Sequence, residues 1–94
     1  MNNMKTLQET ATPMLSKNYK DRFKAEYWQT KIRYEKLKKR NTKVEALNYM
    51  EVKASNDISS PYVNELFRKQ QSVMGEYLHI LEVRAAIEGV DLDD

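Results

Sequence analysis

The sequence predicts an all-α protein: an antiparallel hairpin of two long helices with an N-terminal arm, assembled as a homo-oligomeric helical bundle. Gly and Pro, which disfavour helix interiors, each occur only twice in the 94 residues. The stretch ASNDISSP at 54–61 gathers turn-forming residues and divides the chain into two helical segments. Each segment carries apolar residues on two of its faces, whereas a lone hairpin buries only one.

The arm covers residues 1–17, and the helical hairpin domain covers residues 18–94. The arm has neither the basic start nor the apolar run of a secretory signal peptide. The first helix is expected to run from about 19 to 53, after Asn18 as a helix N-cap. Asp21 would lie in its first turn, where a negative charge is favoured by the helix dipole.

The second helix is expected to run from about 61 to 88. Pro61 suits the first helical position and Ser60 suits the N-cap before it. Gly89 followed by the apolar residue Val90 is typical of a Schellman cap, which ends a helix with glycine in the left-handed conformation.

One apolar stripe on each helix should face the other helix, because the connection between them is short. At about 100° per residue, the members of each stripe gather on one side. They are Tyr19, Phe23, Tyr27, Tyr34, Leu37 and Val44 on the first helix, and Val63, Leu66, Phe67, Met74, Tyr77, Leu78, Leu81 and Ala85 on the second.

A second apolar face lies nearly opposite each stripe, and burying it against another copy predicts a homo-oligomer. It consists of Trp28, Ile32, Ala46, Leu47 and Met50 on the first helix, and of Ser72, Gly75, His79, Val83 and Ala86 on the second, with Ile87 at its margin. Gly75 costs a helix interior roughly 1 kcal/mol relative to Ala, so a packing or ligand contact is expected there.

Charge is unevenly distributed along the chain. Residues 1–55 contain 13 Lys or Arg against 6 Asp or Glu, whereas residues 56–94 contain 3 against 8. The split is consistent with a phosphate-binding surface, but mutual attraction of the two halves is the plainer interpretation.

With no Cys, one His and no glycine-rich phosphate loop, the chain is not expected to be an enzyme or to bind a metal or cofactor. No apolar run reaches the roughly 20 residues of a membrane span, so no membrane partner is expected.

The stretch 31–43 holds seven Lys or Arg and one Glu, and three interpretations stay open. It is a solvated helix face whose lysine stems cover apolar surface, an anion-binding site, or a surface for an acidic protein. In an anion site, an aromatic ring would stack on a base and basic side chains would neutralise phosphates. The candidate ligand-binding residues are Trp28, Lys36, Lys39, Arg40 and Lys43, joined by Arg84 from the second helix. Lys31 and Lys38 lie nearer the hairpin core and should contribute less to ligand binding. The acidic second half of the chain argues against duplex DNA as a partner.

Two segments, 21-DRFKAEYWQTKIRYEKLKK-39 and 70-QQSVMGEYLHILEVRAAIEGVDL-92, carry a family resemblance. The shared patterns are R-F-x-x-E-Y, Q-x-x-x-M-x-x-Y-L-x-x-L-x-x-R and I-E-G-x-x-L. In these the chain resembles small helical proteins of bacteriophages and prophages, related to crAss-like phages and without a defined function. The resemblance supplies no catalytic residues.

What the resemblance implies is a non-enzymatic phage protein that acts in the host cytoplasm against a bacterial defence system. One form of this function is a sponge that sequesters cyclic nucleotide immune signals. The alternatives are a protein-binding inhibitor of a host defence complex such as a CRISPR effector, and a phage structural or nucleic-acid-binding accessory protein. The corresponding partners are another copy of the chain, a cyclic nucleotide ligand and a host defence protein.

Overall fold

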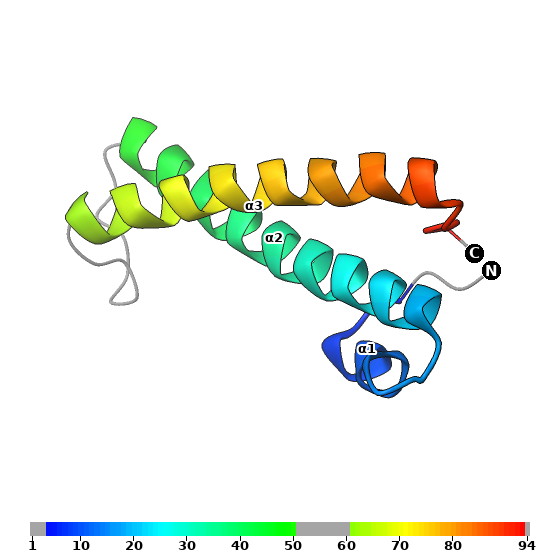
Figure 1. Ribbon diagram of the computed structural model, residues 1–94. Coiled ribbons are helices and arrows are strands. Elements are labelled where there is room, and N and C mark those ends of the chain that lie inside the picture. Colours follow the sequence, from blue (N-terminus) through cyan, green and yellow to red (C-terminus); the bar gives the residue numbers. More distant parts are fainter. Residues whose placement is uncertain (1–3, 51–60, 94) are drawn as a thin grey trace.

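The structure is a computed structural model that describes residues 4–50 and 61–93. These residues form helix α1 (Leu7–Met14), helix α2 (Tyr19–Tyr49) and helix α3 (Pro61–Glu88), and the described part of the chain contains no strand. The prediction of an all-α protein is confirmed to this extent. In Figure 1, α2 and α3 lie alongside each other in opposite directions, and α1 lies beside the N-terminal part of α2.

Helix α2 begins as the sequence predicts. The side-chain oxygen of Asn18 accepts a hydrogen bond from the Lys20 backbone N–H at 2.8 Å, and Asp21 lies in the first turn. The helix ends at Tyr49, before the expected position near residue 53, with Met50 as its C-cap. The predicted N-cap of the second helix, Ser60, lies outside the described residues.

Helix α3 ends in the predicted Schellman cap. Gly89 has φ 73°, in the left-handed region that a residue with a Cβ rarely adopts. The N–H of Val90 donates to the carbonyl oxygen of Ala85 at 2.9 Å, which is the hydrogen bond that defines the motif. The cap turns the chain back on itself, and the Val90 side chain is buried in the core.

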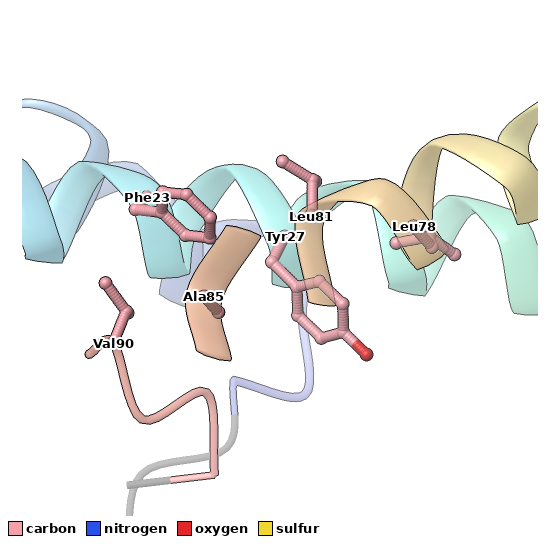
Figure 2. Close-up of a cluster of buried hydrophobic side chains, with 6 residues drawn as sticks. All are labelled: Phe23, Tyr27, Leu78, Leu81, Ala85 and Val90. Atoms are coloured by element: carbon pink, nitrogen blue, oxygen red, sulfur yellow. The ribbon is translucent and has the colours of Figure 1, made fainter. Parts of the chain in front are cut away.

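A cluster of apolar side chains holds the N-terminal half of α2 against the C-terminal half of α3. Figure 2 shows its members: Phe23, Tyr27, Leu78, Leu81, Ala85 and Val90. Trp28, Tyr34 and Leu92 are half-buried and pack against the cluster. Five of the six buried members belong to the predicted stripes, and the sixth, Val90, is the apolar residue of the predicted cap.

Hydrogen bonds between α2 and α3 establish the antiparallel pairing. The Tyr27 hydroxyl donates to Glu82 at 2.7 Å, near the core. Nearer the connection between the helices, the Asn41 amide donates to the Gln71 side chain at 2.9 Å and to the Phe67 carbonyl at 3.1 Å. Residue numbers thus rise along α2 as they fall along α3. Burial raises the pKa of Tyr27, and its hydrogen bond to Glu82 raises it further.

Parts of the predicted stripes are wrong. Leu66 and Tyr77, both expected in the core, are exposed, Leu66 to 62%. They lie roughly 100–120° around α3 from Leu78, outside the width that one facing helix covers. Gly75, expected on the second face, is half-buried and faces Tyr34 of α2 instead.

Helix α1 lies within residues 1–17, for which the sequence predicts an arm and no helix. Thr6 and Glu9 form a capping box: the Thr6 hydroxyl accepts from the Glu9 N–H at 3.2 Å, and the Glu9 carboxylate accepts from the Thr6 N–H at 3.0 Å. Thr10 of α1 and Ala25 of α2 are both fully buried. Ala25 lies roughly 160° around α2 from Phe23, so α1 packs on the side of α2 that faces away from α3.

Candidate ligand-binding groove

A groove of about 390 Å³ lies between the segment that precedes α1 and the adjacent side of α2. We call it the arm groove. Its walls are formed by Met4, Lys5, Trp28, Lys31, Ile32, Glu35, Lys36 and Lys39. This volume falls within the roughly 300–1,000 Å³ of small-molecule pockets in proteins. The residues from α2 follow one another at helical spacing, which brings an aromatic ring, an aliphatic side chain and several lysines onto one side of the helix.

Trp28 is held in a fixed orientation at the groove. Its indole N–H donates to the carbonyl oxygen of Leu92 at 2.8 Å. Its ring meets the Tyr27 ring edge to face, with centroids 5.1 Å apart and planes at 87°. Since the N–H is already engaged, Trp28 offers the groove apolar ring surface, the kind of surface on which a nucleobase stacks.

The groove has an excess of positive charge. Four of its residues are lysines and one is a glutamate, and the single ion pair among them joins Lys31 Nζ to a Glu35 carboxylate oxygen at 3.5 Å. Within residues 4–50 and 61–93, Lys36 and Lys39 form no ion pair, and both side chains are exposed. Flexible, hydrated ammonium groups at the mouth of an apolar groove can turn toward an anionic group of a ligand that lies on Trp28.

The structure brings three of the six predicted binding residues together, namely Trp28, Lys36 and Lys39. Arg40 points across to α3 instead. Its Nη2 donates to the Asn64 side chain at 3.0 Å, and its guanidinium carbon lies 4.0 Å from the centroid of the Phe67 ring. Arg40 therefore contributes to the packing of α2 on α3, because both its charge and its donors are directed into that contact.

Lys43 and Arg84 also lie away from the arm groove. Lys43 is exposed and follows Lys39 by one turn of α2, about 6 Å along the helix axis. Arg84 lies on α3, where its Nε donates to Glu88 at 3.2 Å and its Nη2 donates to the Tyr19 hydroxyl at 3.0 Å. The hydrogen bond to Glu88 raises the pKa of Arg84. The ligand-binding roles of all six residues stay predictions.

Sequence reasoning missed part of the groove. Lys31 was expected near the hairpin core, yet it lines the groove three residues from Trp28, on the same side of α2. Met4 and Lys5 also line the groove, although they lie in the arm, for which no structure is predicted. The capping box of Thr6 and Glu9 could have revealed them, since it fixes where α1 begins and thereby positions the two residues before it.

Other types of site can be compared within the part of the chain that the structure describes. That part holds no group of three or more His, Asp or Glu side chains arranged to bind a metal ion. None of its helices combines the length and the apolar character that a membrane span requires. We carry the arm groove forward because three of the predicted binding residues line it.

Comparison with known proteins gives one result. Neither the curated proteins nor the solved structures contain a match to this chain. The model of the Sequestin family, however, matches residues 17–87, which is well over half of the sequence. The matched region contains α2 and nearly all of α3, including the groove residues contributed by α2. The chain belongs to the Sequestin family, whose name is consistent with a protein that binds and sequesters a ligand.

Proposed function

We propose that this protein is a non-enzymatic phage anti-defence protein that sequesters a cyclic nucleotide immune signal in the arm groove. The observation that carries the proposal is that Trp28, Lys36 and Lys39 line the same groove of about 390 Å³. A cyclic nucleotide combines planar bases with phosphates, and the groove offers a surface for each. Membership of the Sequestin family supports a binding role.

The chemistry of the groove favours holding a ligand over converting it. Its polar lining is almost entirely lysine, with Glu35 engaged by Lys31 at 3.5 Å. Lysine ammonium groups attract phosphates. In a partly apolar site, this charge–charge attraction offsets the free-energy cost of removing a phosphate from water. A sponge requires only this affinity, together with enough copies of the protein to lower the free signal.

The setting of this activity is also part of the proposal. The resemblance to small phage proteins supports action in the host cytoplasm, where a bacterial defence system produces its signals. We further propose that the α2–α3 pair serves as a helical hairpin that assembles into a homo-oligomer. The exposed apolar residues on α3 support such an assembly.

The proposal is tested by titrating a panel of cyclic dinucleotides, cyclic trinucleotides and cyclic ADP-ribose isomers into the protein. Trp28 is the only tryptophan, so its fluorescence reports directly on the groove. We expect one class of ligand to quench or shift this emission in a saturable way. The same ligand should be recovered unmodified after the protein is denatured, whereas a converted product would overturn the non-enzymatic assignment.

Matched charge reversals locate the binding site. Replacing Lys36 and Lys39 by Glu should weaken binding at least about 100-fold, because two attractive charges become repulsive. Replacing Lys17 and Lys38 by Glu changes the net charge equally but at exposed positions outside the groove. Equal losses from both pairs would mean non-specific electrostatics. No binding by any member of the panel, together with capture of a host protein, would replace the sponge by a protein-binding inhibitor.

A further inference from the structure

The outward side of α3 carries a regular stripe that the α2–α3 contact leaves uncovered. Its members are spaced alternately by four and three residues. We call this set the outer stripe; it consists of Tyr62, Leu66, Lys69, Val73, Glu76, Ile80, Val83 and Ile87. Alternate spacings of four and three are the heptad pattern of a coiled-coil seam, with six of the eight positions apolar. It shares only Val83 and Ile87 with the second apolar face predicted from the sequence.

The stripe is exposed over its whole length. Leu66, Val73, Ile80 and Ile87 form one heptad series, and their exposed fractions are 62%, 59%, 54% and 79%. From Tyr62 to Ile87 the stripe spans about 38 Å of helix. The stripe is more than three and a half heptads long, and a heptad pattern sustained over about three to four heptads indicates a coiled coil.

Two charged residues interrupt the apolar series and determine how a second helix would be oriented. Lys69 and Glu76 are one heptad apart, both exposed, and neither forms an ion pair within the described part of the chain. In a parallel pair of α3 helices, each would lie beside its own copy, so like charges would meet. In an antiparallel pair, Lys69 would lie about one turn from the partner's Glu76, and this contact would occur twice.

We propose that the outer stripe binds a second copy of this chain, with the two α3 helices antiparallel about a two-fold axis. The heptad spacing identifies a helix as the occupant, and the charge pattern is complementary to itself only in the antiparallel direction. In one register, each position of the series Leu66, Val73, Ile80 and Ile87 lies opposite a position of the other series, Tyr62, Lys69, Glu76 and Val83. Val73 then lies opposite the partner's Glu76, and Ile80 opposite the partner's Lys69. Leu66 then lies opposite the partner's Val83, and Tyr62 opposite the partner's Ile87.

This surface is independent of the arm groove. The groove lies on the side of α2 that carries Trp28 and Lys39, whereas Tyr27 and Asn41, on another side of α2, hydrogen-bond to α3. Pairing through the outward side of α3 therefore leaves both grooves of the dimer open. The proposal rests on the assembly proposed above and specifies its interface, but it is separate from the ligand-binding role, because its tests involve no ligand.

The first test is the mass of the full chain by light scattering at micromolar concentration. We expect twice the 11.1 kDa of one chain. Val73→Glu places a carboxylate opposite the partner's Glu76, so it should raise the dimer Kd about 100-fold or more, with unchanged helicity by circular dichroism. Thr42→Glu adds the same charge at an exposed position of α2 that belongs to neither predicted apolar face, and it should leave the dimer intact. A monomeric wild-type protein, or equal effects of the two variants, would overturn the proposal.

The second test determines orientation. The chain has no cysteine, so single introduced cysteines give unambiguous cross-links. A mixture of Leu66→Cys and Val83→Cys proteins should form a disulfide-linked heterodimer under mild oxidation. Leu66→Cys alone should not cross-link, because the two sites in an antiparallel dimer lie roughly 25 Å apart along the axis. Efficient cross-linking of Leu66→Cys to itself would show parallel helices and overturn the proposed arrangement.

Discussion

The ring of Tyr34 lies against Gly75 where α2 and α3 cross: a Cβ on Gly75 would be 3.4 Å from Cε1 of the tyrosine. This is the lower limit of an ordinary van der Waals contact, so one methyl group fits. Gly75→Ala should therefore stabilise the protein by about 0.5–1 kcal/mol, since alanine loses less conformational freedom than glycine on entering a helix. Denaturant unfolding followed by circular dichroism measures this difference.

The same position provides a control. Gly75→Leu should destabilise the protein by about 1–3 kcal/mol, because its longer side chain would displace the Tyr34 ring. Loss of stability in the alanine variant as well would show that the glycine is needed for close approach of the two helices.

Arg40 should prove important for stability and not for ligand binding. Its guanidinium lies over Phe67 at 4.0 Å and donates to Asn64 at 3.0 Å. Arg40→Lys keeps the charge but loses the planar fork, so we expect the free energy of unfolding to fall by about 1 kcal/mol. Affinity for the groove ligand should stay within about twofold of wild type. A large loss of affinity with unchanged stability would instead return Arg40 to the binding site.

Glu88 should make stability depend on pH in the acidic range. The hydrogen bond from the Tyr19 hydroxyl, at 2.7 Å, is the main cause that lowers the pKa of Glu88 below its ordinary value of 4.5, and Arg84 adds to it. A carboxyl group with a lowered folded pKa stabilises the protein above its unfolded pKa. That contribution is lost as pH falls through the folded value.

The comparison of wild type with Glu88→Gln isolates this effect. The wild-type protein should have the higher Tm at neutral pH, and the difference should shrink as pH falls below about 4.5. A difference that persists unchanged at pH 3 would assign the effect of Glu88 to its shape and not to its charge.

The capping box should control the local stability of α1. Thr6→Ala removes the hydroxyl that accepts from the Glu9 N–H at 3.2 Å, at a cost of about 1 kcal/mol. We expect faster amide hydrogen exchange in α1, and unchanged exchange at the centre of α3. Since Met4 and Lys5 precede this cap and line the groove, ligand affinity should fall in parallel. Serine at position 6 restores the acceptor and should restore both properties.

Local sequence signals predicted the start of α2 and the end of α3. The caps at Asn18 and Gly89 depend on a few adjacent residues whose hydrogen bonds form within the same turn. The limits of the buried stripe were harder to predict, because they depend on how α3 crosses α2. Leu66 and Tyr77 are apolar and adjacent to core positions, yet they lie beyond the width that α2 covers.

The candidate site likewise contains residues that the sequence places correctly and residues whose position depends on tertiary packing. Helical spacing alone places Lys36 and Lys39 on the side of Trp28, and the structure agrees. Helical spacing does not reveal that the Arg40 side chain turns toward Phe67. Phe67 lies on α3, so this contact depends on how α3 packs against α2. The wall formed by Met4 and Lys5 depends on the path of the chain before α1, which periodicity on α2 does not constrain.

The position of the buried cluster also bears on the order in which the chain folds. Arg40 and Asn64 are joined across 24 residues of chain, whereas Tyr27 and Glu82 are joined across 55. Closing the longer loop first would cost about 0.7 kcal/mol more in chain entropy, so pairing that starts near the connection is favoured. The apolar cluster around Leu81, at the far end of the pair, would then consolidate late. Truncating a side chain in that cluster should accelerate unfolding while leaving the rate of folding nearly unchanged.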